Sequence, residues 1–291
     1  MATSRRTALI CAAALLSAGC ERGIMDPVGP VGAAEKQILI NSTAIMLAIV
    51  IPTIIATIAF AWWFRRGNKK AKYRPDWEYS GAIELVVWAI PALTIILLGG
   101  ITWIGSHNLE PSKPLQSAAP PLKVEVVSLD WKWLFIYPDQ GVATVNELVV
   151  PAGTPVNFRL TSATVWNSFF IPQFGTMIYT MPRMATRLNL QADRVGVYDG
   201  LSSHFSGDGF PGMTFKAHVV PREEFAAWAQ KAHASQLKLD GPAYAELAKP
   251  TSYVKPLTYG TLTPGLFDAI VMTGGPQPNV QHNQPTSAQG N

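Results

Sequence analysis

Two long apolar runs without a charged residue stand out in the first half of the chain, at residues 37–64 and 85–109. At a helical rise of about 1.5 Å per residue, each is long enough to cross a hydrocarbon core of about 30 Å. Trp62 and Trp63 close the first run and Trp103 lies near the end of the second, as aromatic residues do at membrane interfaces. We predict a transmembrane helix hairpin at residues 37–109, with spans at about 38–64 and 84–106. The alternative is a pair of buried helices in a soluble protein.

Shorter apolar and β-branched runs, separated by Gly, Pro and Asp, follow a proline-rich linker. Many short strands at this spacing predict a β-sandwich or barrel at residues 121–220. The expected strands lie at 122–128, 131–137, 143–150, 155–161, 168–171, 185–190 and 213–220. A helical extension is predicted at 221–273, with helices at 222–234 and 242–248, and the polar tail at 274–291 is predicted to be disordered.

Charged residues make up 14% of the chain, well below the roughly 25% usual in soluble domains. The net charge of +4 could suggest nucleic acid, but the excess of basic over acidic residues comes from two places. Arg5 and Arg6 precede the first apolar stretch, and a cluster fills the loop 65–80 between the two spans: Arg65, Arg66, Lys69, Lys70, Lys72 and Arg74. Because positive loops stay in the cytoplasm, we predict a cytoplasmic loop and a mature chain with both ends outside. Nucleic acid is excluded as a partner.

The first 19 residues have the pattern of a secretory leader, with a basic start and an apolar stretch too short to span a bilayer. The sequence from Leu16 to Cys20 (LSAGC) resembles a lipobox, which implies cleavage before Cys20 and attachment of a lipid to its thiol. Residues 20–36 would then be the mature N-terminal segment. An ordinary signal peptide with a chance cysteine is the alternative. The other cysteine, Cys11, leaves with the leader, so no disulfide is expected in the mature chain.

The hairpin followed by an outer β-domain resembles subunit II of the haem–copper respiratory oxidases. The strings DWKW at 130–133, NSFFIP at 167–172 and GVYDG at 196–200 look like motifs of that family. The resemblance implies a cupredoxin β-sandwich held on the outer side of the bacterial inner membrane.

The copper-bearing branch of that family holds a dinuclear centre on two Cys, two His, a Met and a backbone carbonyl. By position, this chain has Asn167 for the first His and Phe210 for the second, while Met213 is retained. Ser202 and Ser206 stand in place of the two Cys, and His204 falls at the carbonyl position. Copper requires soft thiolate ligands, which serine and phenylalanine cannot replace. We therefore expect no metal and no cofactor in this chain.

This loss of ligands resembles ubiquinol oxidase subunit II of the cytochrome bo type. The resemblance implies a proton-translocating enzyme in which ubiquinol delivers electrons from within the bilayer, so cytochrome c is not expected as a partner. Haems and copper B are expected in subunit I, and subunits I, III and IV and membrane lipids are the expected partners. This chain would be a non-catalytic subunit.

Glu84 is the ionisable residue at the start of the second span. A carboxylate there often only marks the membrane boundary, but the family places a glutamate at this point near the entrance of a proton channel in subunit I. We expect a proton-entry role. Trp131 and Trp133 are expected on one face of a strand as core residues. His204, His218 and His233 share no ligand spacing and are expected to be structural.

Two rival functions remain open from the sequence. One is a copper-bearing cytochrome c oxidase subunit, which the missing thiolates argue against. The other is a non-enzymatic membrane lipoprotein that uses a cupredoxin fold for assembly or binding. Glu84 in the hairpin argues against the second rival, because a bare scaffold would need only the lipid.

Overall fold

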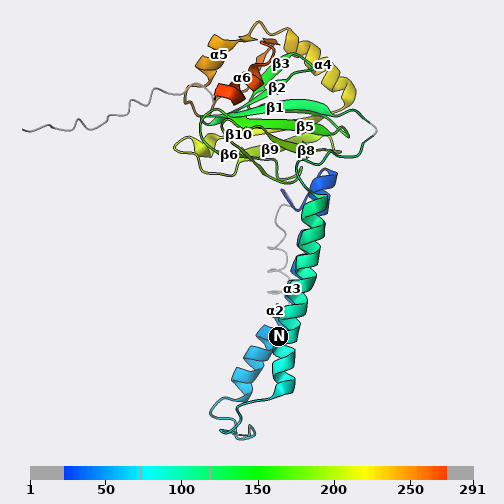
Figure 1. The fold of residues 1–291 in the computed structure, drawn as a ribbon, viewed down its shortest axis with the longest axis vertical. Helices are drawn as coiled ribbons and strands as arrows, with labels where there is room; N and C mark the ends of the chain where they lie inside the picture. The colour runs from blue at the N-terminus through cyan, green and yellow to red at the C-terminus, as the bar shows by residue number, and fades with distance from the viewer. Residues whose placement is uncertain (1–22, 73, 118, 274–291) are drawn as a thin grey trace, which may run out of the picture. The chain divides into compact units, whose positions relative to one another are not determined.

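A computed structural model describes residues 23–72, 74–117 and 119–273 (Figure 1). The described residues form two compact units. One consists of residues 33–110. The other combines the short stretch 23–32 with residues 111–273. Cys20 and the tail 274–291 lie outside the described residues.

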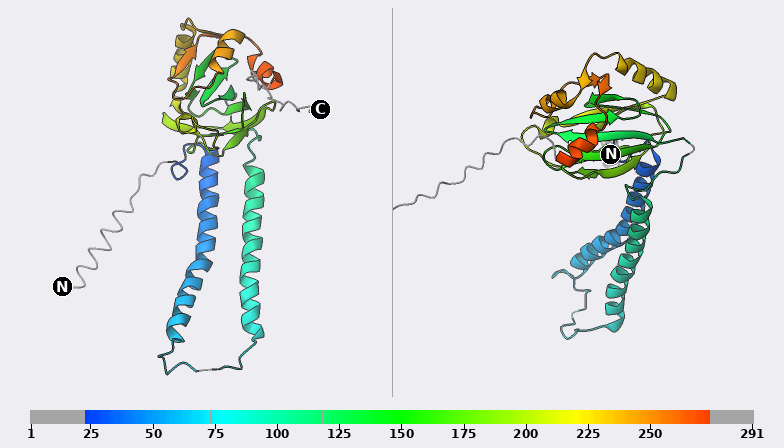
Figure 2. Two further views of the ribbon diagram at one scale, coloured as in Figure 1. Left: turned by 90° about the vertical axis from the view of Figure 1, so that its left-hand side faces the viewer. Right: turned by 45° about the horizontal axis from the view of Figure 1, so that its top comes forward.

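The unit 33–110 is a helical hairpin made by α2 (Pro30–Trp63), which begins in the other unit, and α3 (Gly81–Asn108) (Figure 2). Both helices are long and apolar enough to cross a membrane, and their most hydrophobic stretches are not buried. Such exposure is unlike a core helix of a soluble protein and fits a membrane-anchored subunit. α2 begins before the predicted span because the uncharged run marks the hydrocarbon segment, and the helix continues beyond it through Glu35 and Lys36.

The two helices approach at Gly105. A Cβ there would lie 2.7 Å from Ile38 Cδ1 across the hairpin, so a larger residue would require the end of the Ile38 side chain to shift. Small residues at helix contacts are typical of membrane bundles.

The larger unit contains a two-sheet sandwich with a helical extension. Its six-stranded sheet has the order β12-β3-β2-β1-β5-β8. These strands are β1 (Leu122–Leu129), β2 (Lys132–Tyr137), β3 (Val142–Val145), β5 (Val156–Ser162), β8 (Thr186–Leu190) and β12 (Leu257–Tyr259). The five-stranded sheet has the order β4-β10-β9-β6-β7. It contains β4 (Glu147–Pro151), β6 (Asn167–Phe170), β7 (Ile178–Thr180), β9 (Gly196–Ser202) and β10 (Thr214–Val220).

The sandwich core is an aromatic cluster between the two sheets. Trp133 and Phe135 of β2 face Phe169 of β6 and Phe215 of β10, with ring centroids 5.0–6.3 Å apart. All four side chains are buried. Since successive residues of a strand point to opposite faces, these alternate aromatic positions of β2 supply one face to the core.

The other face of β2 is also buried, under the C-terminal extension. Leu134 and Ile136 join a second apolar cluster with Tyr244, Phe267 and Ile270. The extension consists of α4 (Arg222–His233), β11 (Lys238–Leu239), α5 (Gly241–Leu247), β12, β13 (Thr261–Leu262) and α6 (Leu266–Thr273). Figure 1 shows α5 and α6 on the side of β2 and β3 that faces away from β6, β9 and β10.

Lys132, also on this outer face of β2, fixes the extension through its ammonium group. The Nζ donates to Lys249 O at 2.8 Å and to Thr251 Oγ1 at 2.6 Å, with Asp130 O at 3.3 Å. Burial lowers the pKa of the Lys132 ammonium group, and the negative charge of Asp130 opposes this shift.

The residues just before α2 are docked on the sandwich. Val28 N donates to Gln173 O at 2.8 Å, and Asp193 N donates to Val28 O at 2.7 Å. Val28 and Val31 are buried in the sandwich core cluster, and the carboxylate of Asp26 pairs with Arg194 at 2.8 Å. We call residues 23–32 the docked segment. From the sequence, these residues were predicted only as part of the mature N-terminal segment 20–36, and no contact with the sandwich was predicted.

The strand predictions differ from the structure in several places, and β7 and the short strands of the extension were not predicted. The expected strand 143–150 is split into β3 and β4 at Asn146, which has a positive φ of 55°. Its side-chain Oδ1 accepts a hydrogen bond from Trp133 N at 2.8 Å. No strand was predicted at β9, yet it pairs with β10 along its length. The expected strand from Trp131 begins one residue later, because Trp131 has a φ of 65°, outside the β region.

Candidate functional site

The loop at the positions of the copper ligands connects β9 to β10. The two strands are antiparallel, with Leu201 paired to Thr214, so the loop leaves and returns at one end of the sheet. β6 lies on the other side of β9, with Phe169 opposite Ser202. This register places the start of β6 beside the base of the loop. We call residues 202–213, together with Asn167, the ligand-loop site.

The base of the site is a buried network of neutral polar groups. Ser202 Oγ lies 3.2 Å from Asn167 Oδ1 and 3.2 Å from His204 O, and Ser202 N donates to Met213 O at 3.1 Å. Asn167, Ser202 and Met213 are all nearly inaccessible to solvent. Each polar side chain therefore already has a protein partner, as buried polar groups require.

The middle of the loop is held by Trp131. Its indole Nε1 donates to Ser206 O at 3.0 Å. The ring also lies over Gly209, where a Cβ would come within 2.2 Å of the indole. Ser206 Oγ is 3.8 Å from Met213 Sδ. The expectation that Trp131 and Trp133 share one strand face is wrong, because the positive φ of Trp131 turns its ring onto the loop while Trp133 enters the core.

The two remaining positions face outward. His204 is exposed and meets the ring of Tyr179 edge-on, with centroids 5.7 Å apart. Phe210 is half-buried against Phe205, with centroids 5.5 Å apart. Of the six ligand positions, the structure gathers Asn167, Ser202, Ser206 and Met213 around the loop base and interior. The His204 carbonyl oxygen also faces this base, 3.2 Å from Ser202 Oγ, whereas the His204 imidazole does not join it and the Phe210 ring has no donor atom.

A dinuclear copper centre does not fit this donor set. Its bridging positions hold hydroxyl groups, which do not ionise like thiols at neutral pH, and one terminal position holds a hydrocarbon ring. Met213 Sδ is the one soft donor of the site, and a serine hydroxyl already contacts it. The loop is ordered instead by hydrogen bonds and aromatic packing.

The three outer-domain histidines have separate surroundings. His218 Nε2 lies 3.4 Å from Glu147 Oε1 on the neighbouring strand β4. His233 Nδ1 is 3.0 Å from Gly260 O in the extension. Within the described ranges, no three His, Cys, Asp or Glu side chains are grouped so that they could hold a metal ion.

Glu84 lies in the other unit, in the first turn of α3. The helix begins after Ser80, whose carbonyl accepts from Glu84 N at 3.0 Å. The Glu84 side chain is exposed, and no described residue forms an ion pair with it. A carboxylate in the first turn is favoured by the partial positive charge of the helix N-terminus.

Sequence reasoning missed two features. One is the contact between Trp131 and the loop, for which the two nearby glycines, Gly207 and Gly209, were the available signal. The other is the docked segment, for which the Gly-Pro pattern PVGPVG at 27–32 was the only hint.

Comparisons with known proteins agree with this geometry. Residues 140–220 match the family described as cytochrome c oxidase subunit II, periplasmic domain, and residues 233–273 match the COX aromatic rich motif. The chain is 48% identical over 260 residues to cytochrome bo(3) ubiquinol oxidase subunit 2 of Pseudomonas aeruginosa, covering 89% of this chain and 78% of that one. It is 48% identical over 261 residues to ubiquinol oxidase subunit 2 of Acetobacter aceti, covering 89% and 84%. Quinol oxidase subunit 2 of Bacillus cereus is 31% identical, with 81% and 82% covered.

Proposed function

Because this chain belongs to the ubiquinol oxidase subunit 2 family, we propose that it serves its oxidase as a subunit that carries no electrons. Its hairpin anchors it in the membrane beside the catalytic subunit, and its outer domain covers the outer face of that partner. The haems, copper B and the chemistry of oxygen reduction belong to subunit I, with subunits III and IV as further partners.

The observation that supports this proposal is the filled base of the ligand-loop site. Ser202 and Asn167 satisfy one another and the neighbouring backbone, so they are paired without a metal. Electrons from a water-soluble donor would need a relay at this surface. Ubiquinol is apolar and can reach a partner subunit within the bilayer, so this subunit needs no relay.

Metal analysis of the purified complex tests the proposal. We expect copper to match one copper B site per complex, and ubiquinol-dependent oxygen uptake to persist in a Ser202→Ala, Ser206→Ala double variant. Two additional coppers per complex that disappear in the double variant would overturn the proposal. Haem content, measured on the same samples, controls for loss of the partner.

We further propose that Glu84 accepts protons near their point of entry into subunit I. Its exposure at the start of α3 and the lack of an ion-pair partner within the described chain support this role. Glu84→Gln should slow turnover while haem content and assembly stay normal. Glu78→Gln removes the same charge three residues before α3 begins and is the matched control. Equal oxygen uptake in wild type and Glu84→Gln contradicts the role.

The orientation and the anchor remain proposals as well. We infer that the loop 65–80 is cytoplasmic, that the outer domain is periplasmic in the inner membrane, and that Cys20 carries a lipid. The basic residues of the loop and the LSAGC sequence support these inferences. Labelled fatty acid should enter the wild-type chain and be absent from Cys20→Ser. Incorporation into that variant would show that the lipid is attached elsewhere.

A further inference from the structure

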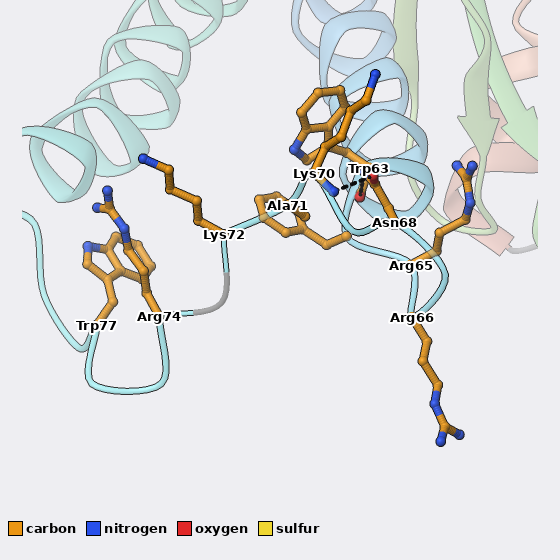
Figure 3. A pocket seen from close by; sticks show the side chains of 10 residues that line it. Trp63, Arg65, Arg66, Asn68, Lys70, Ala71, Lys72, Arg74 and Trp77 are labelled. Atoms are coloured by element: carbon orange, nitrogen blue, oxygen red, sulfur yellow. Dashed lines mark hydrogen bonds between the residues drawn. The ribbon is translucent and has the colours of Figure 1, made fainter.

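The loop between α2 and α3 encloses a hollow of about 800 Å³, open to solvent (Figure 3). Its walls come from two arms of the loop. Trp63 ends α2, and Asn68 and Lys70 belong to the arm that follows it. Lys72, Arg74 and Trp77 belong to the arm that leads toward α3. Its volume lies within the range of ligand-binding pockets. We propose that this hollow binds the headgroup of an anionic glycerophospholipid.

The charges of the hollow favour an anion. Lys70, Lys72 and Arg74 line it, and no carboxylate is among its lining residues. None of these three cations forms an ion pair with any residue that the structure describes. Arg65 and Arg66 also belong to the lining, but Figure 3 shows their side chains directed away from the other labelled residues. Ammonium and guanidinium groups together provide both point charges and a planar fork for phosphate oxygens.

The loop segment that follows α2 is shaped by local hydrogen bonds rather than by charge. Asn68 Nδ2 donates to Trp63 O at 2.6 Å, and Lys70 N donates to Asn68 Oδ1 at 3.1 Å. Asn68 thus ties the end of α2 to the residue that carries the first cation. Figure 3 shows the hydrogen bond between Asn68 and Trp63 close to Lys70.

The position along the chain selects a lipid as the source of the anion. The proposal rests on the hairpin spanning the membrane. The hollow lies in the loop between the two apolar helices, of which one ends at Trp63 and the other begins at Gly81. The hollow would then lie at the level of the lipid headgroups, with Trp63 and Trp77 at the interface. Basic groups next to transmembrane helices attract anionic lipids with about 1 kcal/mol per charge, or roughly fivefold in affinity.

The basic residues of the loop could also act only through their total charge, as a positive-inside signal does. Lys69 distinguishes that explanation from headgroup binding in the hollow. Lys69 is exposed and adjacent to Lys70, but it is not part of the lining. If only the total charge of the loop mattered, the two residues would contribute equally. If the hollow binds a headgroup, Lys70 contributes and Lys69 does not.

Native mass spectrometry of the full chain in nonionic detergent provides the test. Phosphatidylglycerol should bind more tightly than phosphatidylcholine, and Lys70→Gln should weaken phosphatidylglycerol binding about fivefold. Lys69→Gln should leave it nearly unchanged. The triple variant Lys70→Gln, Lys72→Gln, Arg74→Gln should lose the preference. A triple variant with the same charge change on the outer domain, Lys231→Gln, Lys238→Gln, Lys255→Gln, should retain it.

Three results would overturn the proposal. The first is equal affinity for the two lipids, and the second is an equal effect of Lys69→Gln and Lys70→Gln. The third is full displacement of the lipid by an equal concentration of inorganic phosphate, which would assign the hollow to a free anion. If the triple variant cannot be purified, the salt dependence of lipid binding by the wild-type chain still tests the proposal. Raising the salt from about 50 mM to about 500 mM should weaken phosphatidylglycerol binding and leave phosphatidylcholine unchanged, and no salt effect contradicts the proposal.

Discussion

A single methyl group at Gly29 should release the docked segment from the outer domain. A Cβ at this position would lie 1.7 Å from Gln191 O and 2.8 Å from the carbonyl carbon of Gln191. Both are backbone atoms of the sandwich, so no side-chain rotation relieves the contact. In Gly29→Ala the segment must move away, while the sandwich core stays folded.

The cost of that movement follows from the contacts that it breaks. Val28 is 5% exposed, and exposing such a side chain costs about 2 kcal/mol. The hydrogen bonds from Val28 N to Gln173 O and from Asp193 N to Val28 O are lost as well, at about 1 kcal/mol each. The total of about 4 kcal/mol corresponds to a shift on the order of 10²–10³-fold in the local opening equilibrium.

Hydrogen exchange measured by mass spectrometry on the full chain should detect this opening. Peptides that contain the amides of Val28 and Asp193 should exchange on the order of 10²–10³-fold faster in Gly29→Ala, with β2 and β10 unaffected. Gly241→Ala is the matched control, because its added methyl group meets no atom within 4 Å. Unchanged exchange in Gly29→Ala would refute the reasoning, and so would an equal acceleration in the control.

Three further predictions concern the outer domain. Phe169→Ala, which empties the centre of the aromatic cluster, should lower the free energy of unfolding by about 3–5 kcal/mol, measured by denaturant titration with tryptophan fluorescence; a loss under about 1 kcal/mol contradicts this. Lys132→Met leaves Thr251 without its buried donor and should cost about 1–3 kcal/mol, with faster proteolysis of the extension than of the sandwich; equal cleavage rates would argue against it. Burial raises the pKa of the Glu125 carboxyl, opposed by the charge of Arg159, so the folded state keeps a proton that the unfolded chain releases. The ionised carboxylate therefore weakens the fold as the pH rises above about 4.5, and Glu125→Gln should gain stability relative to wild type over that range. A difference that is constant across pH contradicts a raised pKa, and a difference that falls as the pH rises shows that the sign is wrong.

The sequence predicted those elements whose local pattern matches their surroundings. The hairpin follows from two uncharged runs, and most sandwich strands follow from short apolar segments bounded by turn residues. β2 was expected because it is aromatic and β-branched throughout, and both of its faces are buried. In such cases a few neighbouring residues determine the element.

Other features depend on partners that are distant in sequence. β9 contains Gly200 because Phe215 of β10 occupies the space where a Cβ would lie, 2.1 Å from its ring. A glycine weakens the sequence signal for a strand, so this strand is recognised only once its pairing with β10 is known. The docked segment is fixed by residues about 145 positions later, which no local pattern reveals. At the ligand-loop site, the family motif aligned the positions, but only the structure shows that Trp131 holds the loop.

The extension behind β2 has a consequence for how the chain is made. Val127, Leu129, Leu134 and Ile136 pack in one cluster with residues that follow β10, among them Leu239, Tyr244, Phe267 and Ile270, and β12 pairs with the outer edge of β3. Until residues beyond β10 have been synthesised, the sandwich strands therefore have an apolar face and an unpaired edge exposed, both of which favour aggregation. Folding of the outer domain is complete only when α6 has arrived. A chain that stops after Val220 would keep every strand of the five-stranded sheet and still be an aggregation-prone intermediate.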